Sequence, residues 1–161
     1  MGKVLSAFKN GYPGSIARSV DDVVTAFANK SNVPIPFGKA VVISENKDGV
    51  VPFDPTVHTG EHFVGVAVRA PSKTPDTYGS STGSYAPGEL VDVITRGHVV
   101  VEMANSTGGL GSPVSIYKTN GKFIATTTTG ENYIPLPNVH LSARADGDNR
   151  AEILINTRAI L

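Results

Sequence analysis

Residues 85–103 constrain the fold of this chain more than any other stretch. Pro87-Gly88 predicts a turn, because proline fixes one backbone dihedral and glycine supplies the positive one that follows. After the turn, residues with β-branched or apolar side chains occupy alternate positions: Val91, Val93, Thr95, Val99, Val101 and Met103. A period of two indicates a strand with one apolar face and one mixed face. Gly97 lies near its middle and predicts a bulge or bend, so we expect this strand to curl a sheet around a core.

Other apolar runs predict the remaining strands, at residues 39–44, 62–69, 114–126 and 139–155. Asn120-Gly121 suits a type I′ turn and makes residues 114–126 a hairpin. The polar residues 146–149 predict the turn of a second hairpin. Residues 19–28 fit either a helix capped by Ser19 or a β-branched strand, and we favour the strand. The sequence therefore predicts an all-β fold, a single-domain barrel or sandwich of about eight mostly antiparallel strands.

Composition excludes several functional classes. A chain of 161 residues can bury a sizeable core as one domain, and it has no cysteine with which to form a disulfide. Its 14 basic and 14 acidic residues cancel, so it lacks the positive charge of a nucleic-acid binder. It has no apolar run approaching ~20 residues, so we expect no membrane partner.

The first 18 residues show little periodicity but carry the large apolar residues Phe8, Tyr12 and Ile16. They fit either a frayed terminus or an arm that orders against a partner. We expect an N-terminal arm over residues 1–18 and a β-barrel or sandwich domain over residues 19–161. A second irregular segment, residues 70–86, is long enough to indicate a functional or mobile loop.

Residues with catalytic or metal-binding chemistry do not form a recognisable site. His58 and His62 have the spacing of a metal pair on a helix, but Gly60 between them and the strand at His62 argue against a helix. Residues 146–149 resemble the start of a calcium loop, yet Arg150 stands at the next ligand position. No nucleophile, base and oxyanion site come together. We therefore predict a protein that is not an enzyme and has no metal, cofactor or small-molecule substrate.

Five short segments occur in a characteristic order: FGKAVV (37–42), FVGVAV (63–68), YAPGELVDV (85–93), RGHVVV (96–101) and GSPV (111–114). They are preceded by Gly-Tyr-Pro-Gly at residues 11–14. This series resembles the structural cement (head decoration) proteins of tailed bacteriophages. The match covers residues 11–118, and the last forty residues agree in strand pattern.

The resemblance implies a β-rich protein without catalytic residues that binds the outer surface of the assembled phage head and stabilises it. Its expected partners are the major capsid protein and further copies of itself, in a homotrimer. The expected location is the virion surface, after assembly in the host cytoplasm. The residues that we expect to contact the capsid or another subunit are Phe8, Tyr12, Pro13, Ile16, Arg18, Tyr78 and Tyr85.

A different function stays open at this point, that of a carbohydrate- or receptor-binding β-module of the virion, for example on the tail. The segment from Tyr78 to Tyr85 supports it, because it combines two tyrosines with many hydroxyl groups. The absence of tryptophan from the chain argues against it.

Overall fold

The structure is a computed structural model that describes residues 9–70, 83–105, 107–126 and 130–156. Within these residues the chain is all-β, which confirms the predicted fold class. The strands are β1 (Ile16–Ala28), β2 (Ile35–Pro36), β3 (Ala40–Ile43), β4 (Val50–Pro52), β5 (Phe63–Ala67), β6 (Ser84–Tyr85), β7 (Leu90–Glu102), β8 (Pro113–Tyr117), β9 (Phe123–Ala125), β10 (Tyr133–Ala143) and β11 (Arg150–Ile155). One 3₁₀ turn, η1 (Gly60–His62), precedes β5.

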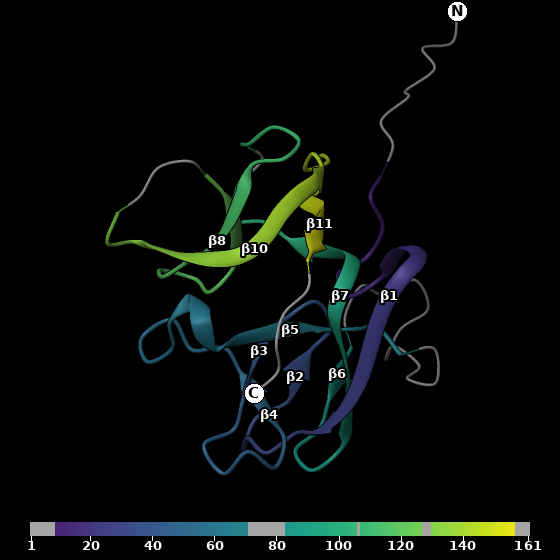
Figure 1. Cartoon of the computed structure of the whole chain (residues 1–161), viewed down its shortest axis with the longest axis vertical. Helices are drawn as coiled ribbons and strands as arrows, with labels where there is room; N and C mark the ends of the chain where they lie inside the picture. The colour runs from purple at the N-terminus through teal and green to yellow at the C-terminus, as the bar shows by residue number, and fades with distance from the viewer. Residues whose placement is uncertain (1–8, 71–82, 106, 127–129, 157–161) are drawn as a thin grey trace, which may run out of the picture.

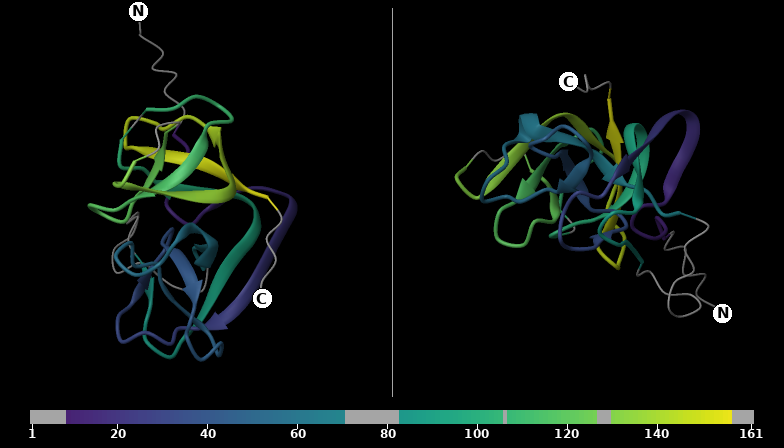
Figure 2. Two further views of the ribbon diagram at one scale, coloured as in Figure 1. Left: turned by 60° about the vertical axis from the view of Figure 1, so that its left-hand side comes forward. Right: turned by 90° about the horizontal axis from the view of Figure 1, so that it is seen from below.

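Nine of these strands form one sheet, in the order β4-β3-β5-β7-β11-β10-β8-β9, with β1 paired to β7; β2 and β6 form a separate pair. The neighbouring strands pair in antiparallel fashion. β7 and β1 run side by side from one half of the molecule to the other (Figures 1 and 2). One half contains β2 to β6, and the other contains β8 to β11.

The two terminal strands of the sheet, β4 and β9, are each bridged to a residue that follows another strand of the same sheet. Beyond β4, Val50 bridges to Asn29, just after β1, and the Lys30 amide donates to the Val50 carbonyl at 2.9 Å. Beyond β9, Phe123 bridges in the same way to Met103, just after β7. Each half of the molecule is thus a small curled unit, and β7 contributes to both.

The alternate apolar residues of β7 belong to one hydrophobic cluster before Gly97 and to another after it. Before the glycine, Val91 and Val93 pack in the cluster of the β2–β6 half, while Ile94 packs in the other cluster. After the glycine, Val99 and Val101 join Ile94 in that second cluster. The residues predicted for the apolar face of this strand are buried, but they do not share one core, because those before Gly97 and those after it belong to different clusters.

The bulge lies in the pairing of β7 with β1. Residues 19–22 of β1 lie between the pairs Arg18↔His98 and Val23↔Arg96, opposite Gly97. Gly97 has φ +121°, and a Cβ there would lie 2.0 Å from Asp22 Oδ1. The same carboxylate accepts the His98 amide at 3.3 Å. Asp22 therefore occupies the space that a side chain at residue 97 would need.

The other predicted elements are found with shifted ends. Residues 19–28 form a strand, as favoured, but it begins at Ile16, so the predicted boundary at residue 18 falls inside β1. Both predicted hairpins are present, β8–β9 and β10–β11. The type I′ turn predicted at Asn120-Gly121 is wrong, because Gly121 has a positive φ but Asn120 does not, and the loop runs from the end of β8 at Tyr117 to the start of β9 at Phe123. The strand predicted from His62 starts one residue later, because His62 ends η1.

We expect Gly97→Val to destabilise the protein by about 3 kcal/mol, because it adds a strained backbone conformation to an overlap with Asp22. For a chain of this size the melting temperature should fall by roughly 6–12 °C. Thermal unfolding followed by circular dichroism measures this shift.

Gly88→Ala is the matched control, because Gly88 also has a positive φ, +83°, but no atom lies within 4 Å of the position of its Cβ. This variant should lower the free energy of unfolding by only about 1 kcal/mol, which is the cost of a positive φ at a residue with a Cβ. Equal melting temperatures for the two variants would show that the Asp22 contact does not matter.

Candidate functional site

The first described residues, 9–15, are bound to the body of the protein, and we call this segment the N-terminal anchor. The Asn10 amide donates to Asp146 Oδ2 at 2.9 Å. Asn10 Nδ2 donates to the carbonyls of Arg144 and Arg150, both at 2.7 Å. One asparagine thus makes three hydrogen bonds to the β10–β11 turn, and these hold the segment in one position.

The anchor is also joined to β7 and β5. The Gly14 amide donates to the Val100 carbonyl, and the Gly14 carbonyl accepts the Arg69 amide, both at 2.8 Å. Gly14 is buried with φ +82°, and a Cβ would lie 2.9 Å from the Arg69 nitrogen. Residues 9–18 of the predicted arm therefore belong to the folded body, and residues 1–8 lie outside the described part of the chain.

Tyr12 lies between two guanidinium groups. The guanidinium carbons of Arg69 and Arg150 are each 5.1 Å from the centre of its ring, and 39% of the residue is exposed. Arg150 Nη1 also donates to the Gly11 carbonyl at 3.3 Å. Because a cation over an aromatic face is attracted by the ring quadrupole, the ring connects β11 to the end of β5.

The β10–β11 turn is organised by the Asp146 carboxylate. Its Oδ1 accepts the amides of Asp148 and Arg150 at 2.9 and 3.0 Å, which confirms a hairpin turn rather than a calcium loop. Burial acts to raise the pKa of Asp146, but the hydrogen bonds from Asn10, Arg150 and Asp148 outweigh it, and the pKa is lowered. The carboxylate that receives the anchor is thus ionised at neutral pH.

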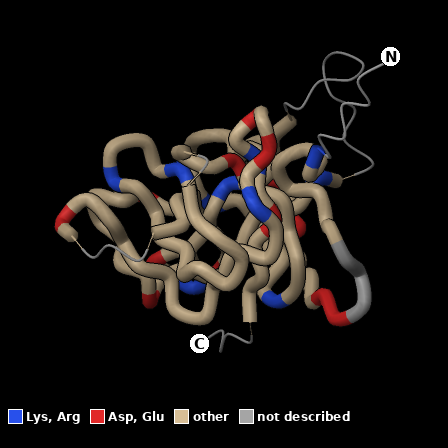
Figure 3. The backbone as a smooth tube through the Cα atoms, turned by 90° about the horizontal axis from the view of Figure 1, so that it is seen from above, with Lys and Arg blue, Asp and Glu red and all other residues tan. Residues whose placement is uncertain are grey.

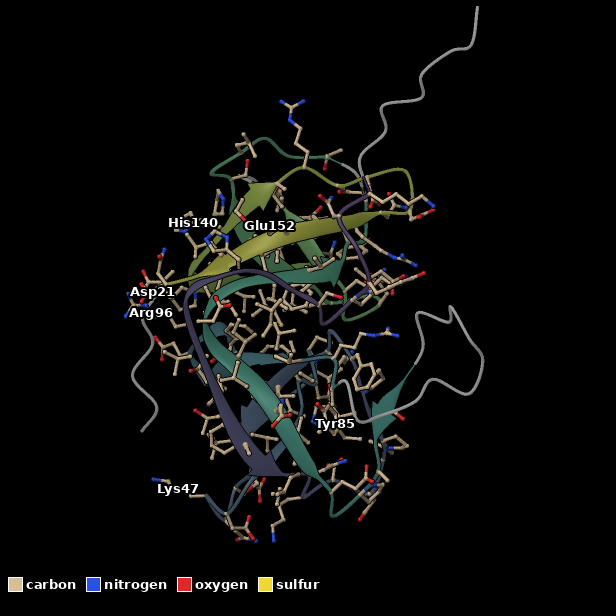
Figure 4. All side chains as sticks on the ribbon, turned by 90° about the vertical axis from the view of Figure 1, so that its right-hand side faces the viewer. Asp21, Lys47, Tyr85, Arg96, His140 and Glu152 are labelled. Atoms are coloured by element: carbon tan, nitrogen blue, oxygen red, sulfur yellow. The ribbon has the colours of Figure 1, made fainter. Side chains whose placement is uncertain are left out.

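Tyr85 is part of the hydrophobic core. It is 1% exposed, its hydroxyl donates to the Val68 carbonyl at 2.6 Å, and its ring meets that of Phe37 edge-on at 5.4 Å (Figure 4). Burial, with the nearby Asp92, raises the pKa of Tyr85 to about 12, so the hydroxyl keeps its proton. We therefore leave Tyr85 out of the contact set proposed below.

The remaining candidates divide into three groups. Phe8 and Tyr78 lie outside the described residues. Arg18 is paired with His98 in the backbone of β1. Ile16 is 41% exposed at the start of that strand, and Pro13 is half-buried within the anchor.

The structure brings the two predicted contact segments to one region. The 70–86 segment rejoins the described chain at Gly83, whose carbonyl accepts the Phe37 amide at 3.0 Å. The Arg69 guanidinium, one residue before that segment, lies over both Tyr12 and Phe37, at 5.1 and 5.8 Å. The anchor and both ends of the segment thus meet around Arg69 and Phe37.

A polar cluster on the outer face of the sheet was not predicted. Glu152 Oε1 lies 2.9 Å from both His98 Nδ1 and Ser142 Oγ, and so joins β7, β11 and β10. Glu152 is 8% exposed. The sequence signal that could have found it is its position between the apolar residues Ala151 and Ile153 of a predicted strand. Figure 4 labels Glu152 on β11, His140 on the neighbouring strand β10, and the ion pair of Asp21 with Arg96.

These polar groups do not form a metal site. Across the described ranges, no cluster of three or more His, Cys, Asp or Glu side chains could hold a metal ion. The rings of His58 and His62 lie 5.9 Å apart, but each Nδ1 accepts a backbone amide. Acidic and basic residues are interspersed along the chain (Figure 3). None of the described helices is long and apolar enough to cross a membrane.

The ring of Tyr12 should contribute to stability through its two guanidinium neighbours. Tyr12→Phe keeps a ring between Arg69 and Arg150, whereas Tyr12→Leu keeps an apolar side chain without one. We expect the Phe variant to be more stable than the Leu variant by about 1–2 kcal/mol, measured by urea unfolding. Equal stabilities would show that the guanidinium contacts contribute nothing.

The comparisons with known proteins agree with this architecture. The family model described as "Structural cement protein (E217 gp24/Pam3 gp6)" matches residues 3–156. A chain from the capsid of Myoviridae phage XM1 superimposes with a TM-score of 0.74 at 15% identity, covering 96% of each chain. The N base of head fiber gp8.5 of bacteriophage phi29 gives a TM-score of 0.41 at 15% identity, covering 88% of this chain and 98% of that one. No curated protein matches the sequence.

The XM1 chain shows a shared fold, and the phi29 similarity is too low to support an argument. The family match covers nearly the whole chain and therefore carries the assignment. It also agrees with the resemblance found from the ordered segments between residues 37 and 114. The chain belongs to the phage structural cement protein family, and it is a capsid decoration protein, a non-enzymatic component of the phage virion.

Proposed function

We propose that this cement protein binds the outer surface of the assembled head as a homotrimer, bridging neighbouring major capsid protein subunits through an N-terminal arm and its surroundings. The observation that supports it most is the anchor. Its hydrogen bonds and the two cation–π contacts fix the chain up to Lys9, so residues 1–8 start from a defined point on the body. Ordering a short arm from a fixed start costs less entropy than ordering a longer free one.

The proposed contact set combines residues 1–8 with three residues beside them: Tyr12, Pro13 and Ile16. Tyr12 and Ile16 are each about two-fifths exposed although they belong to ordered segments. Large apolar side chains presented on a rigid frame suit the centre of a protein interface. Arg18 and Tyr78 stay in the set as predictions from the sequence.

A trimer on a repeated lattice gains from simultaneous attachment. Linking several weak sites can raise overall avidity by ~10²–10⁴ without stronger individual contacts. The formal net charge of zero supports attachment through apolar and hydrogen-bonding groups, which salt weakens less than long-range charge attraction. We propose no nucleic-acid, membrane or small-molecule partner.

We expect removal of residues 2–8 to leave the melting temperature close to that of the full chain, because the anchor stays intact. The same truncation should lower occupancy on capsids that have been stripped of this protein. Co-sedimentation at a series of protein concentrations measures the occupancy. Equal occupancy for truncated and full-length proteins would refute the role of the arm.

Removal of residues 2–15 is the matched comparison. It also deletes the bonds of Asn10 and Gly14 and the Tyr12 ring, so it should lower stability as well as occupancy. This pair of truncations separates the loss of capsid contacts from the loss of folding.

The trimer is tested separately, by the mass of the protein in solution and by electron cryomicroscopy of capsids re-decorated with it. We expect density for three copies around a local threefold axis. Density for single copies with no contact between them would refute the trimer and leave capsid binding itself in place.

A further inference from the structure

The segment from Asp54 to His62 contains two histidines, and each is used as an acceptor. The Asp54 amide donates to His58 Nδ1 at 2.9 Å, and the Thr59 amide donates to His62 Nδ1 at 3.0 Å. An imidazole nitrogen accepts only when it carries no proton, so each of these two hydrogen bonds requires an Nδ1 without a proton. The fold of the segment therefore depends on the protonation state of its histidines.

This segment also joins the two halves of the molecule. Gly60 packs directly on β10, since a Cβ there would lie 1.9 Å from the Pro135 carbonyl oxygen. The segment and the start of β10 line an open groove of about 790 Å³, with Val57, His58 and Glu61 on one side and Tyr133 and Pro137 on the other. Movement of the segment would open this groove and loosen the contact between the halves.

We propose that residues 54–62 form an acid-sensitive latch, in which protonation of His58, assisted by His62, breaks the hydrogen bonds that hold the segment in the conformation that packs Gly60 against β10. A protonated Nδ1 presents a hydrogen to the amide that it faced as an acceptor, so two donors would point at each other about 3 Å apart. Two imidazolium rings with centres 5.9 Å apart would also repel each other. This proposal is independent of how the protein attaches to the capsid.

The two histidines are not equivalent. His62 Nδ1 also lies 3.2 Å from the Thr59 hydroxyl, which can accept a hydrogen from the protonated ring. His58 packs edge-on against Phe53 at 5.6 Å, and its Nδ1 faces the Asp54 amide. We therefore expect His58 to be the main trigger.

The charged groups around His58 act in both directions. Burial, followed by the charge of His62, lowers its pKa from 6.5, while Asp54 and Glu45 act to raise it. Hydrogen bonds from Thr56 lower the pKa of Asp54, so this carboxylate keeps its charge over the whole range. Lys39 lies close enough to Asp54 to lower that pKa further, and Glu61 and Lys118 also line the groove. Burial outweighs the carboxylates at His58.

The sign of the pH dependence follows from the lowered pKa. In the open segment His58 would titrate near its ordinary value of about 6.5, and in the closed segment it titrates lower. The closed state is therefore fully favoured above about pH 6.5, and it loses this advantage as the pH falls from there to the lowered pKa. Between the two pKa values, the opening equilibrium constant should rise up to about tenfold for each unit of falling pH.

Amide hydrogen exchange of the full chain tests the latch between pH 7.5 and 5. The protection factor of the Asp54 amide, corrected for intrinsic exchange, should fall with pH in the natural sequence. In His58→Asn it should stay nearly flat, because the Asn Oδ1 accepts the same amide and does not titrate. His62→Asn should reduce the pH dependence less, and His140→Asn, outside the segment, should leave it unchanged.

Three outcomes would overturn the proposal. The first is protection at Asp54 that does not change with pH, and the second is a pH dependence that His58→Asn leaves intact. The third is protection lost at the same pH at Asp54 and in the core strands, which would show global unfolding. If His58→Asn does not fold, the side-chain nitrogen NMR signals of the natural protein decide: a proton on Nδ1 of His58 at pH 8 would exclude the latch.

Discussion

The contact between Asp22 and Gly97 is the constraint on which the rest of the structure depends. It lies at a bulge in the longest strand pairing of the sheet, where residues 19–22 of β1 lie opposite Gly97 of β7. Val93 and Val101, on the two sides of Gly97, belong to different hydrophobic clusters although they lie at positions of the same parity. β7 and β1 both run through the two halves of the molecule, and one hydrophobic cluster combines residues of both, such as Phe63 of β5 and Ile153 of β11. The halves can therefore move relative to each other only by disturbing this shared core as well as the contact of Gly60 with Pro135.

The N-terminal anchor is attached to this rigid frame. Asn10 and Tyr12 attach to the turn before β11, whereas Gly14 attaches to β7 and to the end of β5. The anchor thus crosses both halves, and the chain that precedes it starts from a fixed position. For a protein that decorates a capsid, such a start is useful, because the chain enters the folded body at the same point, Lys9, in every copy. The Arg69 side chain, between Tyr12 and Phe37, joins this region to the ends of the 70–86 segment.

Sequence patterns predicted the all-β fold, both hairpins and the bend at Gly97, because these features depend on local rules of alternation and turn chemistry. These patterns did not indicate contacts made by residues that lie far apart in the sequence. Alternation counted straight through Gly97 placed Val91 and Val101 on one face, and nothing local indicates that Asp22 fills the bulge. Tyr85, one of the predicted contact residues, is buried in this structure by Phe37 and the Val68 carbonyl. The first 18 residues were predicted as a frayed terminus or as an arm that orders against a partner; the bonds of Asn10 were not expected, because their acceptors lie more than 130 residues away in the sequence.

The closure of the sheet at Asn29–Val50 and at Met103–Phe123 has a consequence for crowding. A decoration protein accumulates at high local density on a curved shell, where unprotected strands of neighbouring molecules would be prone to fuse into continuous fibres. Here each terminal strand already has a partner in its own molecule at one point, β4 at Val50 and β9 at Phe123. A neighbouring molecule cannot extend the sheet at those two points, so contacts between copies on a shell must form elsewhere on the surface.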